Sequence, residues 1–178
     1  NVPYDKIPVR PAQHYLMGGI NTDLDGQTNI RGLYACGECA WTGIHGGNRL
    51  ASNSMLECLV FGRRAAKKVV SDFRSPDDYE LVTSPEPLSD GESRPAEYYV
   101  SKRAELRSVM TADANAVRTP KGMAHGKAYV DSLIDELDRL RLDSRAGYEL
   151  YSMATAADCI LTGAINRKES VGAHYIEP

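Results

Sequence analysis

The most constraining feature of this sequence is a set of three apolar stripes in its C-terminal half. Within each stripe apolar residues recur every three or four positions, which places them on one face of a helix. The stripes are Leu106, Val109, Met110 and Val117; Met123, Val130, Leu133, Ile134, Leu137 and Leu140; and Leu150, Met153, Ala154, Ala157, Ile160, Leu161 and Ile165. Three such faces need a common core, so residues 96–178 are predicted to form a three-helix antiparallel bundle. Thr119 and Pro120 mark the start of the second helix, as cap and first-turn proline.

Residues 1–72 are predicted to form short strands and one helix. Nine of the fifteen glycines lie between Gly18 and Gly62, a density typical of tight turns and of backbone that approaches a ligand closely. Asp25-Gly26 is a hairpin signal between the stretches 16–20 and 27–30. The apolar run 33–36 is suited to a buried strand.

The helix of this N-terminal part is predicted to begin at about Ser54, where Ser52 and Asn53 are suitable caps. Its apolar face is predicted to comprise Met55, Leu56, Leu59, Val60, Val69 and Val70. Between this helix and the bundle, residues 73–95 are rich in Pro, Ser and acidic residues and show no periodicity. This stretch is therefore predicted to be a linker.

Composition excludes several classes of function. The net charge is −3, so no basic field would recruit nucleic acid or anionic lipid. No apolar run approaches the ~20 residues of a membrane span, and no signal peptide is visible. The four cysteines do not form the pattern of a disulfide-stapled secreted domain, which predicts a cytoplasmic location. Because the chain starts at Asn1 in an apolar, proline-punctuated stretch, we expect a piece of a longer protein.

The stretch 37–57 is the strongest candidate for chemistry. Glu38 follows the predicted strand at its carboxyl edge, where ligands bind in open α/β folds. Arg49 offers a planar, two-pronged donor for a carboxylate or phosphate. The first amides of the following helix, including those of Ser54 and Met55, lack partners within the helix and would stabilise negative charge. The alternative is a glycine-rich turn with Arg49 in a surface ion pair.

His14 is the second candidate, because it precedes a Gly-Gly pair and could donate to a substrate carboxylate. The alternative is a partly buried histidine bonded to backbone, and only pairing with Arg49 favours the functional interpretation. His45 lies inside the glycine loop, where it touches a ligand or braces the loop. Cys36 and Cys39 form a lone CxxC, which rarely means a redox or zinc site without a second pair, so no metal site is predicted. Cys58 and Cys159 are predicted to be small core residues.

Three segments carry a family resemblance: PAQHYLMGGI, GLYACGE and TGIHGGNRLASNSMLECLVFGRRAA. They resemble the flavoprotein superfamily of L-aspartate oxidase, succinate dehydrogenase and fumarate reductase, and TGIHGGNRLASNSMLE is most similar to the L-aspartate oxidase branch. The tail NRKESVGAHYIEP resembles the helical tail of the same superfamily, although Val171 stands where an arginine is usual. The implied fold is the C-terminal part of an FAD-binding α/β domain followed by the helical bundle.

The resemblance also implies an activity and its site residues. It implies FAD-dependent oxidation of L-aspartate to iminoaspartate for quinolinate and NAD biosynthesis, with oxygen or fumarate as electron acceptor and quinolinate synthase as a candidate partner. Glu38 would bind the sugar-alcohol chain of FAD, and Ser54 and Met55 its isoalloxazine ring. His14 and Arg49 would bind the substrate carboxylates. No residue of this chain is implied as a catalytic acid or base.

Two further expectations follow from what the sequence lacks. It contains no GxGxxG fingerprint and no capping domain, which the family places upstream. We therefore expect this chain alone to be inactive and to bind FAD weakly or not at all. A succinate dehydrogenase or fumarate reductase flavoprotein is the alternative enzyme. The alternative of another class is a non-catalytic helical interaction module built on residues 96–178.

Overall fold

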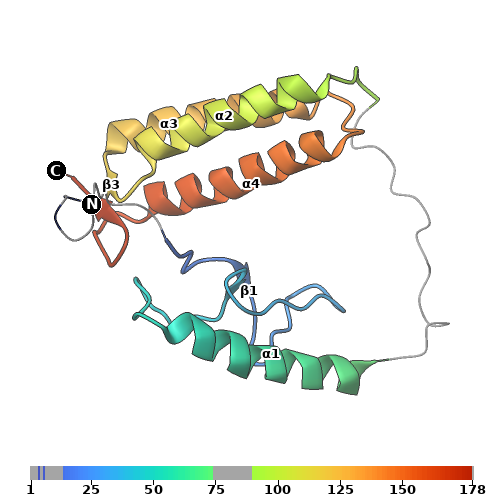
Figure 1. The fold of residues 1–178 in the computed structure, drawn as a ribbon, viewed down its shortest axis with the longest axis vertical. Helices are drawn as coiled ribbons and strands as arrows, with labels where there is room; N and C mark the ends of the chain where they lie inside the picture. The colour runs from blue at the N-terminus through green and yellow to red at the C-terminus, as the bar shows by residue number, and fades with distance from the viewer. Residues whose placement is uncertain (1–3, 5, 7–13, 74–89, 178) are drawn as a thin grey trace. The chain divides into compact units, whose positions relative to one another are not determined.

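The computed structural model describes residues 4, 6, 14–73 and 90–177. They belong to two compact units. Unit 1 comprises Asn1–Leu81 and Val171–Ala173, and unit 2 comprises Val82–Ser170 and His174–Pro178. Most of the predicted linker, residues 74–89, lies outside the described residues. The two units are therefore taken in turn (Figure 1).

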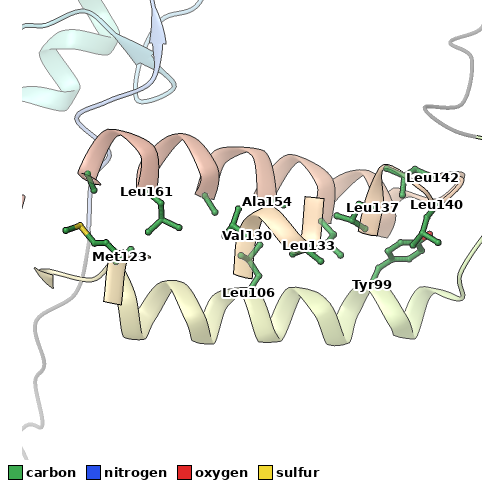
Figure 2. Close-up of a cluster of buried hydrophobic side chains, with 14 residues drawn as sticks. Tyr99, Leu106, Met123, Val130, Leu133, Leu137, Leu140, Leu142, Ala154 and Leu161 are labelled. Carbon is green, nitrogen blue, oxygen red and sulfur yellow. The ribbon is translucent and has the colours of Figure 1, made fainter. Parts of the chain in front are cut away.

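Unit 2 contains three long helices, α2 (Ala96–Asp113), α3 (Pro120–Leu137) and α4 (Arg145–Asn166). They lie side by side around one apolar core (Figures 1 and 2). The fully buried side chains come from all three helices and the connection that follows α3: Tyr99, Leu106, Val130, Leu137, Leu142, Leu150 and Leu161. The three predicted stripes thus supply most of this core, as their helical spacing indicated.

Helices α3 and α4 begin at side-chain caps, whereas α2 begins after Pro95 without one. The Thr119 hydroxyl accepts a hydrogen bond from the Gly122 amide at 3.0 Å, and Pro120 follows in the first turn. Ser144 caps α4 in the same way, accepting from the Gly147 amide at 3.2 Å. Each side chain satisfies one amide that the helix itself cannot. The predicted start of the second helix at Thr119-Pro120 is confirmed.

Two positions of the predicted stripes lie outside the helices. Val117 belongs to β3 (Val117–Arg118), which pairs in parallel with β4 (Tyr175–Ile176), and its side chain is half exposed. Its assignment to the first stripe was wrong because α2 ends at Asp113. Leu140 follows the end of α3 but is still buried in the core.

Unit 1 contains a two-stranded parallel sheet of β1 (Ile20–Asn21) and β2 (Ala40–Trp41), and the helix α1 (Asn53–Asp72). The predicted hairpin is therefore wrong in its pairing, because the stretch that contains Ile20 pairs with Ala40. The stretch after the turn instead forms an antiparallel bridge between Gln27 and Tyr34. The run 33–36 provides that bridge and no regular strand.

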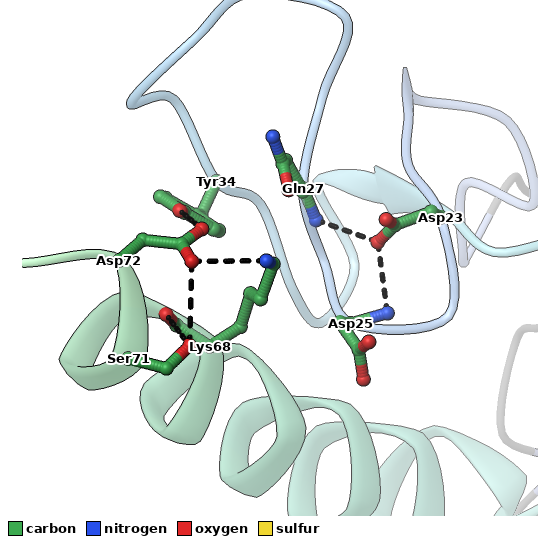
Figure 3. A network of polar contacts seen from close by, with 7 residues as sticks. All are labelled: Asp23, Asp25, Gln27, Tyr34, Lys68, Ser71 and Asp72. Atoms are coloured by element: carbon green, nitrogen blue, oxygen red, sulfur yellow. Dashed lines mark hydrogen bonds and ion pairs between the residues drawn. The ribbon is translucent and has the colours of Figure 1, made fainter.

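Asp25-Gly26 does form a tight turn, held by one carboxylate. The Asp23 side chain accepts hydrogen bonds from the amides of Asp25 and Gln27 at 2.8 and 2.9 Å (Figure 3). Gly26 adopts φ 75°, and a Cβ there would lie 2.9 Å from the Cβ of Ala65 in α1. Glycine thus permits both the left-handed turn and its close approach to the helix.

Helix α1 turns a different face inward from the one predicted. Its buried side chains are Glu57, Phe61 and Ala65, whereas all six residues of the predicted apolar face are exposed. Near its C-terminal end, Asp72 accepts a hydrogen bond from the Tyr34 hydroxyl at 2.7 Å and pairs with Lys68 at 2.9 Å (Figure 3). The described part of unit 1 therefore leaves an apolar surface along the helix uncovered.

Candidate functional site

A buried carboxylate organises the glycine-rich loop of unit 1. Glu57 is only 2 % exposed. It accepts hydrogen bonds from the hydroxyls of Tyr15 and Thr42 at 2.6 and 2.7 Å, and His45 Nε2 lies 2.7 Å from its Oε2. Two segments, the one before β1 and the loop after β2, thus meet at one side chain of α1. Through this contact with Glu57, His45 braces the loop from inside.

The environment of Glu57 keeps it ionised. Burial by itself would raise the pKa of the carboxyl group, but the hydrogen bonds from Tyr15, Thr42 and His45 outweigh burial and lower it below its ordinary value. Conversely, burial and the bond to this carboxylate raise the pKa of the Tyr15 phenol. Tyr15 is therefore a neutral donor to a charged acceptor, which is a strong type of hydrogen bond.

Arg49 lies over the ring of Tyr15, which is one of the hydrogen-bond partners of Glu57. Its guanidinium carbon lies 4.4 Å from the centroid of the Tyr15 ring, a cation–π contact. Nη1 makes a long hydrogen bond of 3.4 Å to the Leu50 carbonyl, and Nε is buried without a partner in the described part of the chain. Within the same part, no carboxylate pairs with Arg49, so the surface ion pair offered as the alternative is not found there.

His14 is exposed, and no described residue hydrogen-bonds to its ring. The alternative of a partly buried, backbone-bonded histidine is therefore wrong. Within the described residues no contact joins the His14 side chain to Arg49, and the relation between the two is that Tyr15, the next residue after His14, contacts Arg49.

Glu38 and the start of α1 provide groups suited to a cofactor. One oxygen of Glu38 accepts the Leu16 amide at 3.1 Å, and within the described residues the other has no partner. Ser52, at the cap position, has φ 69° and makes no side-chain cap. The amide of Ser54 has no acceptor in the described residues, but that of Met55 donates to the Ser52 carbonyl at 3.2 Å. The expectation of a free Met55 amide is therefore wrong, because the helix begins with a tighter turn.

These groups fit the FAD that the sequence implies at two points. The unpartnered Ser54 amide lies at a helix N-terminus, where backbone donors and the helix dipole favour a negatively charged group. The free oxygen of Glu38 can accept a hydrogen bond from a hydroxyl group of a ligand. Gly43 has φ 78° and carries no side chain, so the backbone of the loop is accessible to a ligand at this position.

The other candidates carry no site in the described residues. All four cysteines are free and exposed, so Cys58 and Cys159 are not the core residues predicted. No group of described histidines, cysteines and acids is arranged to hold a metal ion. Within the described ranges, each helix is too short or too polar to cross a membrane.

The sequence did not reveal the roles of Tyr15 and Glu57. A usable signal was present, since Glu57 is the single acid among apolar residues in the first half of α1. Its burial depends on partners 12 to 42 residues away, which no local pattern specifies.

Both parts of the chain match known protein families. A family described as "FAD binding domain" matches residues 1–55, which include all five predicted site residues. A second, described as "Fumarate reductase flavoprotein C-term", matches residues 103–177.

Curated relatives named L-aspartate oxidase align with nearly the whole chain. The protein from Acinetobacter baylyi is 38 % identical over 98 % of this chain, and L-aspartate oxidase 1 of Ralstonia nicotianae is 40 % identical over 95 %. The alignments cover 33 % and 32 % of those two relatives. The chain thus spans about a third of the length of the curated relatives it matches.

Solved structures of related flavoproteins share the fold. A variant of the E. coli quinol fumarate reductase matches 99 % of this chain and 33 % of its own, with a TM-score of 0.77 and 29 % identity. The Sdh1 complex of Mycobacterium smegmatis in its apo form matches 92 % of this chain and 30 % of its own, with a TM-score of 0.66 and 26 % identity. The chain therefore belongs to the FAD-dependent flavoprotein family of L-aspartate oxidase, succinate dehydrogenase and fumarate reductase.

Proposed function

We propose that this chain is part of an L-aspartate oxidase, which oxidises L-aspartate to iminoaspartate with FAD and supplies NAD biosynthesis. The observation that carries the proposal is Arg49, a guanidinium seated on an aromatic ring with no acid paired to it in the described residues. A cation held in this way keeps its donors for the carboxylate of an incoming substrate. Relatives of this name across nearly the whole chain support the same substrate.

The residues of this chain would bind and orient the substrate. Arg49 would hold one carboxylate of L-aspartate in two-pronged fashion, and His14 would donate to a carboxylate from the adjacent segment. Bound FAD supplies the redox chemistry by accepting the two electrons that the substrate loses. Fixing a small diacid in one pose accounts for a large part of the rate in such a reaction. The Ser54 amide and the start of α1 would favour negative charge on the cofactor.

A second candidate is the flavoprotein of a succinate dehydrogenase or fumarate reductase, favoured by the solved structures that share the fold. Supplying the FAD-loaded full-length protein with L-aspartate or succinate separates the two. We expect hydrogen peroxide from L-aspartate in air and none from succinate, since L-aspartate is the proposed electron donor. Oxidation of succinate with a dye acceptor and no turnover of L-aspartate would establish the second candidate.

The 178-residue chain by itself is expected to be inactive and to purify without FAD. The exposed side chains of α1, including Met55 at 66 % and Leu59 at 64 %, form the surface that would pack against the upstream part of the domain. Flavin absorbance of the purified chain checks this, with the full-length protein as control. One flavin per chain would contradict the expectation.

Four further parts of the proposal concern the domains, location, electron acceptor and partner of the enzyme. The domain boundaries are proposed at 1–72 and 96–178, with 73–95 between them. We place the enzyme in the cytoplasm and give it oxygen or fumarate as electron acceptor. Quinolinate synthase is the candidate partner, because it would consume the product.

A further inference from the structure

We propose that Tyr15 is a positioning residue, whose ring seats the Arg49 guanidinium for a dicarboxylate while its hydroxyl anchors that ring to the buried Glu57. The inference rests on the proposed function and adds a residue to its substrate site. It assigns Tyr15 no contact with substrate. Its effect passes entirely through Arg49.

The first step is the way in which Arg49 is held. A guanidinium over an aromatic face is attracted by the ring quadrupole without using its N–H donors. The 4.4 Å separation from the Tyr15 centroid is a close contact of this kind. An acidic neighbour would instead occupy the same donors that a substrate carboxylate needs. The Tyr15 ring thus fixes the position of the Arg49 guanidinium without neutralising its positive charge.

The second step is the way in which the Tyr15 ring is held. Its hydroxyl donates to Glu57 at 2.6 Å, and the His45 ring packs against it edge-on, with centroids 5.5 Å apart and planes at 89°. His45 is itself bonded to the same carboxylate. Two contacts of different chemistry therefore define the position and tilt of the ring.

The third step is the burial of the anchor. Glu57 lies in α1, and its three partners come from the segment before β1 and from the loop after β2. A buried charge with this set of donors has few alternative positions, because a lost partner would leave it unpaired away from water. The Glu57 carboxylate consequently links the loop after β2, which leads to Arg49, to the segment that carries His14.

The test is a double-mutant cycle on the FAD-loaded full-length protein, with succinate as a dicarboxylate probe and flavin absorbance as the readout of its dissociation constant. Arg49→Ala is expected to weaken binding by about 30-fold or more, as the loss of charge-assisted hydrogen bonds does. Tyr15→Leu is expected to weaken succinate binding about 10-fold, by loss of the cation–π contact with Arg49. Tyr15→Phe keeps the ring but loses its anchor to Glu57, and is expected to weaken binding by less than Tyr15→Leu does. Tyr148→Leu, a change at a half-exposed tyrosine of α4, is the control.

The decisive comparison is Tyr15→Leu in the Arg49→Ala background. A residue that acts only through Arg49 has no further effect there, so the double variant should match Arg49→Ala within a factor of about two. A full additional loss from Tyr15→Leu in that background, or a greater loss from Tyr15→Phe than from Tyr15→Leu in the wild-type background, would overturn the inference while leaving the function intact. Equal binding of succinate by wild type and Arg49→Ala would instead overturn the proposed function.

Discussion

Replacing Arg49 by Ala in the full-length protein is expected to lower kcat/KM for L-aspartate by about 100-fold or more. The reason is geometric, because the guanidinium would fix one carboxylate and so the whole substrate against the flavin. Arg49→Lys keeps the charge but loses the planar fork, and is expected to recover only part of the loss. Steady-state rates of peroxide formation over a range of L-aspartate concentrations measure both effects.

A matched control is available in unit 2. Arg107 is exposed on α2, and its side chain makes no hydrogen bond or ion pair with any residue that the structure describes. Arg107→Ala is expected to leave kcat/KM within about 2-fold of wild type, as for a surface change away from structural features. If Arg49→Ala also retained wild-type rates, Arg49 would not bind the substrate, and the interpretation of residues 96–178 as a non-catalytic module would gain support.

Truncating Leu161 to Ala is expected to lower the free energy of unfolding of the bundle by about 2–5 kcal/mol. Its side chain is completely buried between α4 and the two other helices (Figure 2). Removing three carbon atoms there loses their burial and leaves a cavity that close packing only partly refills. Urea unfolding of the 178-residue chain, followed by far-ultraviolet circular dichroism, gives the change.

Val100→Ala provides the comparison for this experiment. Val100 lies in the same bundle, on α2, but is 50 % exposed. Its truncation is expected to change the free energy of unfolding by no more than about 0.5 kcal/mol. A loss below about 1 kcal/mol for Leu161→Ala would show that the core can collapse around the deleted atoms, against the packing described above.

The bundle was predictable because its helices pack against one another within one stretch of the chain. Leu150, Ala154 and Leu161 repeat at the helical period and face one core, and that core is complete within unit 2. The same reasoning failed for α1, where Leu56 and Leu59 also repeat at that period but are exposed. A period identifies a face of a helix, but which face is covered depends on the chain that packs against it.

The errors in unit 1 have a related cause. Asp25-Gly26 was correctly interpreted as a turn, yet the strand expected before it pairs in parallel with Ala40. Parallel partners are separated by intervening chain, so a local turn signal does not identify them. The cysteines were misjudged similarly, since Cys58 lies on the outward side of a helix whose inner side is occupied by Glu57.

The sequence by itself determined the three helices of the bundle and the capped start of the second at Thr119, because spacing and residue chemistry are local properties. It also offered the candidate ligands around Arg49 on the same local grounds. Only the tertiary structure decided that the Tyr15 ring contacts Arg49 and that the Tyr15 hydroxyl donates to a buried Glu57. Those contacts join segments up to 42 residues apart, and the burial of a charge is stable only when all its partners arrive together. The fold brings them to one point, and no single segment encodes that meeting.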